Sequence, residues 1–155
     1  MPKFKNINRI RPAAVHFEKY GYYTNALPGT REYYEYWDNE KERCMYGYTA
    51  DEGTEDALYV TGFHYFYLNY CPIDRAVDEE LPDGTIQSKR ERTFPSFYDG
   101  DHHYFMEIDE ARKTNRHMVV LKARRKGYSY KAGSMLARNY FFVKNSKNFV
   151  FAGQK

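Results

Sequence analysis

The sequence predicts an α/β protein in which the start of a parallel sheet follows an aromatic-rich α+β lead-in that contains a hairpin. In roughly the last 60 residues, strand-like and helix-like segments alternate, which is typical of parallel α/β sheets. Upstream, the turn residues Pro82-Asp83-Gly84 separate two β-type runs and predict a hairpin. The 155 residues include 17 Tyr, 11 Phe and one Trp, enough for one ordinary domain with an aromatic core.

Residues 1–56 form the first part of the lead-in. Residues 1–29 are basic and interrupted by proline and glycine, so we expect them to be extended or loosely packed. Thr30 is a suitable N-cap for a helix that runs to about Cys44, and Gly47 is a stop signal soon after it. The acidic run at 51–56 predicts a solvated loop.

Residues 57–155 contain the remaining elements, taken here in order. A dense apolar and aromatic run predicts a short helix at about 62–69 and a strand at 70–77. The hairpin turn leads into a second strand at 85–93, which Phe94-Pro95 ends. We then expect a helix at 99–113, a strand at 117–123, a helix from Ser129 to about Val143 and a last strand at 148–152.

Charge and cysteine content limit the possible environments and partners. The net charge is only +3, but basic residues gather near the N-terminus and at 122–131, which favours an anionic partner for these clusters. Cys44 and Cys71 lie far apart and have no C-x-x-C partner, so we expect unpaired thiols in a reducing compartment. No apolar run approaches the ~20 residues of a membrane span, so no membrane association is expected.

The most informative stretch joins the strand expected at 117–123 to the helix expected from Ser129. It reads Lys122-Ala123-Arg124-Arg125-Lys126-Gly127-Tyr128-Ser129. A strand, a loop and a helix N-terminus in this order favour phosphate, because backbone amides and the helix dipole both point at the loop. Against the pattern G-x-x-x-x-G-K-[ST], Gly127 and Ser129 match, Lys122 replaces the first glycine and Tyr128 replaces the lysine.

Roles follow if the loop binds a nucleoside triphosphate with Mg²⁺. The amides of about Arg125 to Ser129, through Lys126, Gly127 and Tyr128, would hold the β-phosphate, and the Ser129 hydroxyl would bind Mg²⁺. Lys122 would fold back over the opening and supply the ammonium for the β- and γ-phosphates. Arg124 or Arg125 would stabilise transition-state charge in a neighbouring subunit. The alternative is a solvated basic turn with no ligand.

These residues resemble the deviant Walker A of large terminase subunits, the ATP-driven DNA-packaging motors of tailed phages. Some members likewise carry the lysine at the start of the loop and an aromatic residue before the hydroxyl residue. The order upstream is also similar: an aromatic segment at 65–73, a hairpin with a glycine turn, and a helix that leads to the loop. The resemblance covers roughly 57–155 and is strongest at 118–131.

The resemblance implies a P-loop NTPase sheet of the ASCE type beginning in 57–155, with ATP and Mg²⁺ as ligands. It implies double-stranded DNA, a small terminase subunit, a portal protein and further copies of the chain as partners, in the host cytoplasm and transiently at the procapsid portal. Arg124 matches an arginine proposed to act in trans. The adenine-contacting Gln is absent, so Tyr98, Asp99 or Asp101 would serve. The chain ends before any Walker B carboxylates, so we expect a front portion of a longer protein that hydrolyses ATP poorly by itself.

Two other classes of function stay open at this point. The first is a nucleic-acid-binding module that uses the basic loop against phosphates and tyrosines against bases. The second is a virion structural or adaptor protein whose aromatic residues form interfaces. Two further features are expected to be structural: His102-His103 as a polar turn and not a metal site, and Trp37 as part of a buried helix face and not a stacking platform.

Overall fold

The computed structural model describes residues 7–123 and 126–148. The chain forms a 3-10 turn η1 (Ile7–Ile10), then α1 (Pro12–Tyr20) and α2 (Arg31–Tyr46), followed by the short strands β1 (Tyr48–Ala50) and β2 (Leu58–Val60). After these come α3 (Gly62–Tyr70), the strands β3 (Ile73–Glu80) and β4 (Ile86–Thr93), α4 (Asp99–Lys113) and α5 (Tyr128–Phe142). The class is therefore mixed α and β, with two small antiparallel sheets in the described part of the chain.

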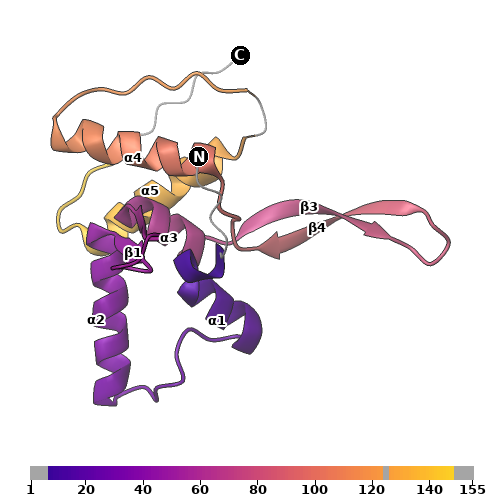
Figure 1. The fold of residues 1–155 in the computed structure, drawn as a ribbon, viewed down its shortest axis with the longest axis horizontal. Coiled ribbons are helices and arrows are strands. Elements are labelled where there is room, and N and C mark those ends of the chain that lie inside the picture. Colours follow the sequence, from indigo (N-terminus) through magenta and orange to yellow (C-terminus); the bar gives the residue numbers. More distant parts are fainter. Residues whose placement is uncertain (1–6, 124–125, 149–155) are drawn as a thin grey trace.

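Helix α3 is the centre of the molecule. Its residues Gly62 to Asn69 are all buried, and α1, α2, α4 and α5 pack around it (Figure 1). A side chain at Gly62 would place its Cβ 2.5 Å from the carbonyl oxygen of Cys44, so only glycine allows α2 and α3 to approach this closely. The core thus draws on both predicted segments, 1–56 and 57–155.

A buried carboxylate ties α2 to α3. Glu40 is only 3% exposed, and it accepts hydrogen bonds from the hydroxyls of Tyr65 at 2.8 Å and Tyr70 at 2.5 Å. Arg43 completes the set with an ion pair at 2.6 Å. Because each carboxylate oxygen has a partner, the buried charge is compensated. Tyr65 and Tyr70 therefore contribute both their rings and their hydroxyls to the contact between α2 and α3.

Most of the predicted elements are confirmed. Thr30 caps α2 by accepting a hydrogen bond from the amide of Tyr33, and Gly47 follows the helix end. The predicted helix at 99–113 matches α4, and the helices predicted near 62–69 and from Ser129 match α3 and α5 within one or two residues. The strand predicted at 70–77 lies three residues later, as β3, because Tyr70 still belongs to α3. The antiparallel hairpin β3–β4 turns at 81–85 and projects from the helical body (Figure 1).

The expectation for the N-terminal segment is wrong. Residues predicted to be loosely packed form η1 and α1, and Ile10, Ala13 and Ala14 are buried. The reason lies in α3, where the Asn69 side chain accepts hydrogen bonds from the amides of Ala13 and Ala14 at 3.1 and 3.2 Å. A cap supplied from so distant a residue leaves no local sequence signal.

The strand expected at 117–123 is also absent. This segment is irregular chain, and Val119 and Leu121 are 87% and 96% exposed. An apolar run becomes a strand only when a neighbour pairs with its backbone groups, and no described segment does so here. The last strand predicted, 148–152, falls almost entirely on residues 149–155, which lie outside the described part. The structure described here therefore contains no parallel sheet.

Candidate functional site

The predicted phosphate loop, residues 122–129, leads into the N-terminus of α5. Gly127 precedes the helix in the left-handed conformation, with φ of 68°, and its carbonyl accepts the first helical hydrogen bond from the Lys131 amide. A glycine has no side chain to cap the helix, and α5 has no acidic residue in its first turn. The positive end of the helix dipole is therefore not neutralised from within the helix.

Lys122 reaches this helix N-terminus. Its ammonium lies 5.5 Å from the centre of the Tyr128 ring, and Tyr128 is the first residue of α5. The side chain of Lys122 is exposed. The ammonium of Lys122 therefore lies near the residue that precedes Ser129.

Lys131 has a different role, which the sequence did not reveal. It is 2% exposed, pairs with the carboxylate of Asp101 and donates a hydrogen bond at 3.0 Å to the carbonyl of Lys126. Its ammonium also lies 4.3 Å from the centre of the Tyr128 ring. The charge of Lys131 is therefore neutralised inside the protein, where it fastens α5 to α4 and to the loop.

Tyr67 lines the loop from the side of α3. A Cβ added to Gly127 would lie 3.9 Å from the Tyr67 hydroxyl, so the two residues are near neighbours. Burial raises the pKa of Tyr67, and the carboxylate of Asp101 raises it further. The hydroxyl therefore stays protonated and presents a neutral polar group beside the loop. The sequence offered no signal for this contact, because Tyr67 and Gly127 are far apart along the chain.

The other predicted site residues are placed as follows. Lys126 and Ser129 are exposed at the loop and in the first turn of α5. Tyr98 precedes α4, is 54% exposed and accepts a hydrogen bond from Arg75 at 3.4 Å. Arg124 and Arg125 lie outside the described residues. Asp101 pairs with Lys131, and Asp99 is exposed at the start of α4.

His102 and the two cysteines have contacts within the described part of the chain that show their local surroundings. A ring nitrogen of His102 lies 2.9 Å from the carbonyl oxygen of Tyr59, and the described residues contain no group of three potential metal ligands. Cys44 and Cys71 are both free thiols. Burial raises the pKa of Cys71 to about 12, so this thiol is a poor nucleophile at neutral pH.

Trp37 lies within an aromatic cluster that joins α2 to neighbouring segments. Its ring is partly buried and lies within 6.4 Å, between centroids, of four tyrosine rings: Tyr23, Tyr33, Tyr36 and Tyr70. These are edge-to-face or tilted contacts, the usual geometry of packed aromatic side chains. The surroundings of Trp37 match a helix face that packs against neighbouring segments.

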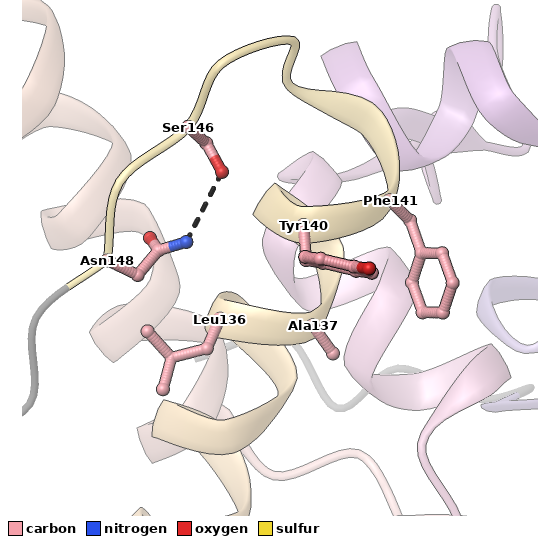
Figure 2. Close-up of a pocket in the computed structure, with 6 residues that line it drawn as sticks. All are labelled: Leu136, Ala137, Tyr140, Phe141, Ser146 and Asn148. Atoms are coloured by element: carbon pink, nitrogen blue, oxygen red, sulfur yellow. Dashed lines mark hydrogen bonds between the residues drawn. The ribbon is translucent and has the colours of Figure 1, made fainter.

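A separate open pocket of about 490 Å³ lies at the other end of α5 (Figure 2). It is lined by Leu136, Ala137, Tyr140, Phe141, Ser146 and Asn148. The lining carries no charged side chain and shares no residue with the loop at 122–129. This pocket is therefore distinct from the predicted phosphate site.

Comparison with known proteins gives no match for this chain, whether to a family model, a curated protein or a solved structure. Within the described residues, no helix combines the length and the apolar character that crossing a membrane requires.

Proposed function

We propose that the chain is the N-terminal part of a terminase-like DNA-packaging ATPase and that the loop at 122–129 binds the phosphates of Mg-ATP. One observation carries the proposal: the ammonium of Lys122 lies over the ring of Tyr128, at the start of a helix that has no side-chain cap. A cation close to the N-terminus of a helix favours the binding of an anion.

The distribution of charge supports an anionic ligand at this place. Lys131 is compensated by Asp101, whereas Lys122 and Lys126 have no carboxylate partner among the described residues. Both lysines are exposed, so their ammonium groups are accessible to a ligand in solution. A triphosphate would supply the negative charge that the described loop lacks.

The remaining roles belong to the same proposal. Ser129 binds Mg²⁺ through its hydroxyl, Tyr98 contacts the adenine, and Arg124 acts on the transition state in a neighbouring copy, with Arg125 as the alternative. The partners are double-stranded DNA, a small terminase subunit and a portal protein, in the host cytoplasm and at the procapsid portal.

The test is the substitution Lys122→Ala, with Lys126→Ala as the matched control. Both lysines are exposed and belong to one loop, but only Lys122 lies over Tyr128. We expect Lys122→Ala to weaken Mg-ATP binding by about tenfold to a hundredfold, the loss typical of one charge-assisted contact. Lys126→Ala should change the Kd by less than about fivefold. Isothermal titration calorimetry with Mg-ATP measures both.

Equal and small effects of the two substitutions would contradict the proposal. The exposed basic loop also fits a nucleic-acid-binding module, which predicts a different pattern. In that case duplex DNA binding would fall steeply with salt, and Mg-ATP would give the loop no protection against proteolysis.

A further inference from the structure

The β3–β4 hairpin has no third strand among the described residues to stabilise it. Apart from Ile73 and Thr93 at its base, every residue of both strands is exposed. The hairpin projects from the helical body (Figure 1), and Arg75 holds its base through hydrogen bonds to Ser96 and Tyr98. A two-stranded ribbon alone is at best marginally stable in water. A further strand at either edge would stabilise it.

The two strands carry opposite charge. Strand β3 has four carboxylates and one arginine, which gives a net charge of −3. Strand β4 has three basic residues and one glutamate, which gives +2. One edge of the hairpin is therefore acidic and the other is basic.

Only the base of the hairpin neutralises its charges internally. Asp74 lies opposite Arg92, with an ion pair at 3.4 Å, and Arg75 lies opposite Glu91. Nearer the tip, the charged residues face neutral ones: Asp78 faces Ser88, Glu79 faces Gln87, Glu80 faces Ile86, Lys89 faces Val77 and Arg90 faces Ala76. None of these five charged residues forms an ion pair within the described structure. They are available to a partner strand.

The backbone at both edges is also available. The Leu81 amide donates to the Thr85 carbonyl at 2.8 Å, so this pair is hydrogen-bonded across the ribbon. Hydrogen-bonded and non-hydrogen-bonded pairs alternate in an antiparallel ladder. The amides and carbonyls of Ala76 and Asp78 on β3, and of Ser88 and Arg90 on β4, therefore point outward.

We propose that this chain assembles by edge pairing of its hairpins, with β3 of one copy antiparallel to β4 of a second copy. An offset of two residues from the register within the hairpin places Asp78 opposite Arg90 of the second copy and Glu79 opposite Lys89 of the second copy. This offset keeps outward amides opposite outward carbonyls and leaves each side chain on its own face. The inference is independent of nucleotide binding.

The opposite charges of the two strands favour pairing of β3 with β4 over pairing of like strands. Pairing of β3 with β3 would bring acidic residues together, and pairing of β4 with β4 would bring basic residues together. Pairing of unlike edges is head-to-tail, so it generates a ring or an open filament and not a closed twofold dimer. Nucleic acid is a poorer occupant, because every phosphate near β4 would also lie near the carboxylates of β3.

Two proline substitutions test the edges separately. Ala76→Pro removes an outward amide of β3, and Ser88→Pro removes one of β4; neither amide serves the ladder within the hairpin. In sedimentation velocity runs, the unsubstituted chain should associate with increasing concentration, and each variant should remain a monomer. An equimolar mixture should form a heterodimer and stop there, because the intact β4 edge of one variant meets the intact β3 edge of the other.

A charge series provides a test that leaves the backbone unaltered. The double change Asp78→Lys and Glu79→Lys should weaken association by about tenfold, since two cross-strand pairs become repulsive. Mixing this variant with a second variant that carries Lys89→Glu and Arg90→Glu should restore association. A chain that stays monomeric at every concentration would overturn the proposal, as would a Ser88→Pro variant that still dimerises or a mixture that does not pair. Loss of duplex DNA binding without any change in self-association would assign the hairpin to nucleic acid instead.

Discussion

At the scale of single residues, His64 is the clearest case of a polar group that the fold excludes from water. It is fully buried on α3, both ring nitrogens lack a hydrogen-bond partner among the described residues, and its ring stacks against Phe97 and Phe105. Burial lowers the pKa of His64 well below 6.5, and the neighbouring His102 and Lys131 lower it further. The folded protein therefore holds this imidazole in its neutral form.

This residue predicts a pH dependence of stability. The unfolded chain protonates His64 near its ordinary pKa of 6.5, whereas the folded chain does not. The unfolded state then binds more protons below about pH 6.5, so the free energy of unfolding should fall as the pH drops from 7.5 to 5. His64→Phe should flatten this slope, and the exposed control His103→Gln should not. Urea unfolding at several pH values measures it, and identical slopes for all three proteins would refute the role of His64.

At the scale of elements, α1 depends on a side chain from α3. The Asn69 carboxamide accepts the amides of Ala13 and Ala14, and it donates to the carbonyls of Ile10 and Tyr65 at 3.4 and 3.0 Å. These bonds give the amides in the first turn of α1 an acceptor, because Arg11 at the N-cap position provides no side-chain cap. One buried amide group thus fixes both the start of α1 and its position on α3.

Asn69→Ala should release α1 from the core. We expect a loss of about 2 kcal/mol in the free energy of unfolding, because buried amides lose their acceptor. Hydrogen exchange of the α1 amides should accelerate more than that of α2. Asn25→Ala is the matched control, since Asn25 is exposed in the segment between α1 and α2. Unchanged exchange in α1 would show that the cap does not hold this helix.

At the scale of the whole molecule, Arg138 connects the last described helix to the first long one. From α5 it donates to the carbonyls of Cys44 and Met45 at 2.9 and 2.8 Å, at the C-terminal end of α2. Its guanidinium also lies 4.6 Å from the ring centre of Phe63 in α3. Three helices therefore meet at one side chain, which is only 4% exposed.

Arg138→Met should destabilise the whole fold by about 3 kcal/mol, because the buried carbonyls of α2 lose charge-assisted donors. Arg112→Met is the control: Arg112 is exposed and lies 4.7 Å from the same Phe63 ring, so its loss should cost less than about 1 kcal/mol. Urea denaturation monitored by tryptophan fluorescence measures both. Equal losses in the free energy of unfolding would show that the contact with the Phe63 ring, and not the hydrogen bonds to the α2 carbonyls, accounts for the effect of Arg138→Met.

Much of the fold was predictable where the signals are local. The cap at Thr30, the glycine turn of the hairpin and the apolar face of 99–113 each depend on residues within one turn or one strand pair. The basic loop was also recognisable in the sequence, and its Gly127 precedes the first residue of α5 while the ammonium of Lys122 lies near the ring of Tyr128. The short strands β1 and β2 were not predicted, because three residues are too few to show an alternating pattern.

The sequence alone determined the order of helices α2 to α5, the hairpin and the position of the basic loop, since propensities, local caps and turn residues act between near neighbours. Only the tertiary structure decided that residues 12–20 form a helix, that Lys131 pairs with Asp101, and that 117–123 lacks a strand partner in the described chain. The cap that Asn69 supplies to α1, the buried ion pair of Lys131 and strand pairing all join residues far apart in sequence. Such contacts exist only once the chain has folded.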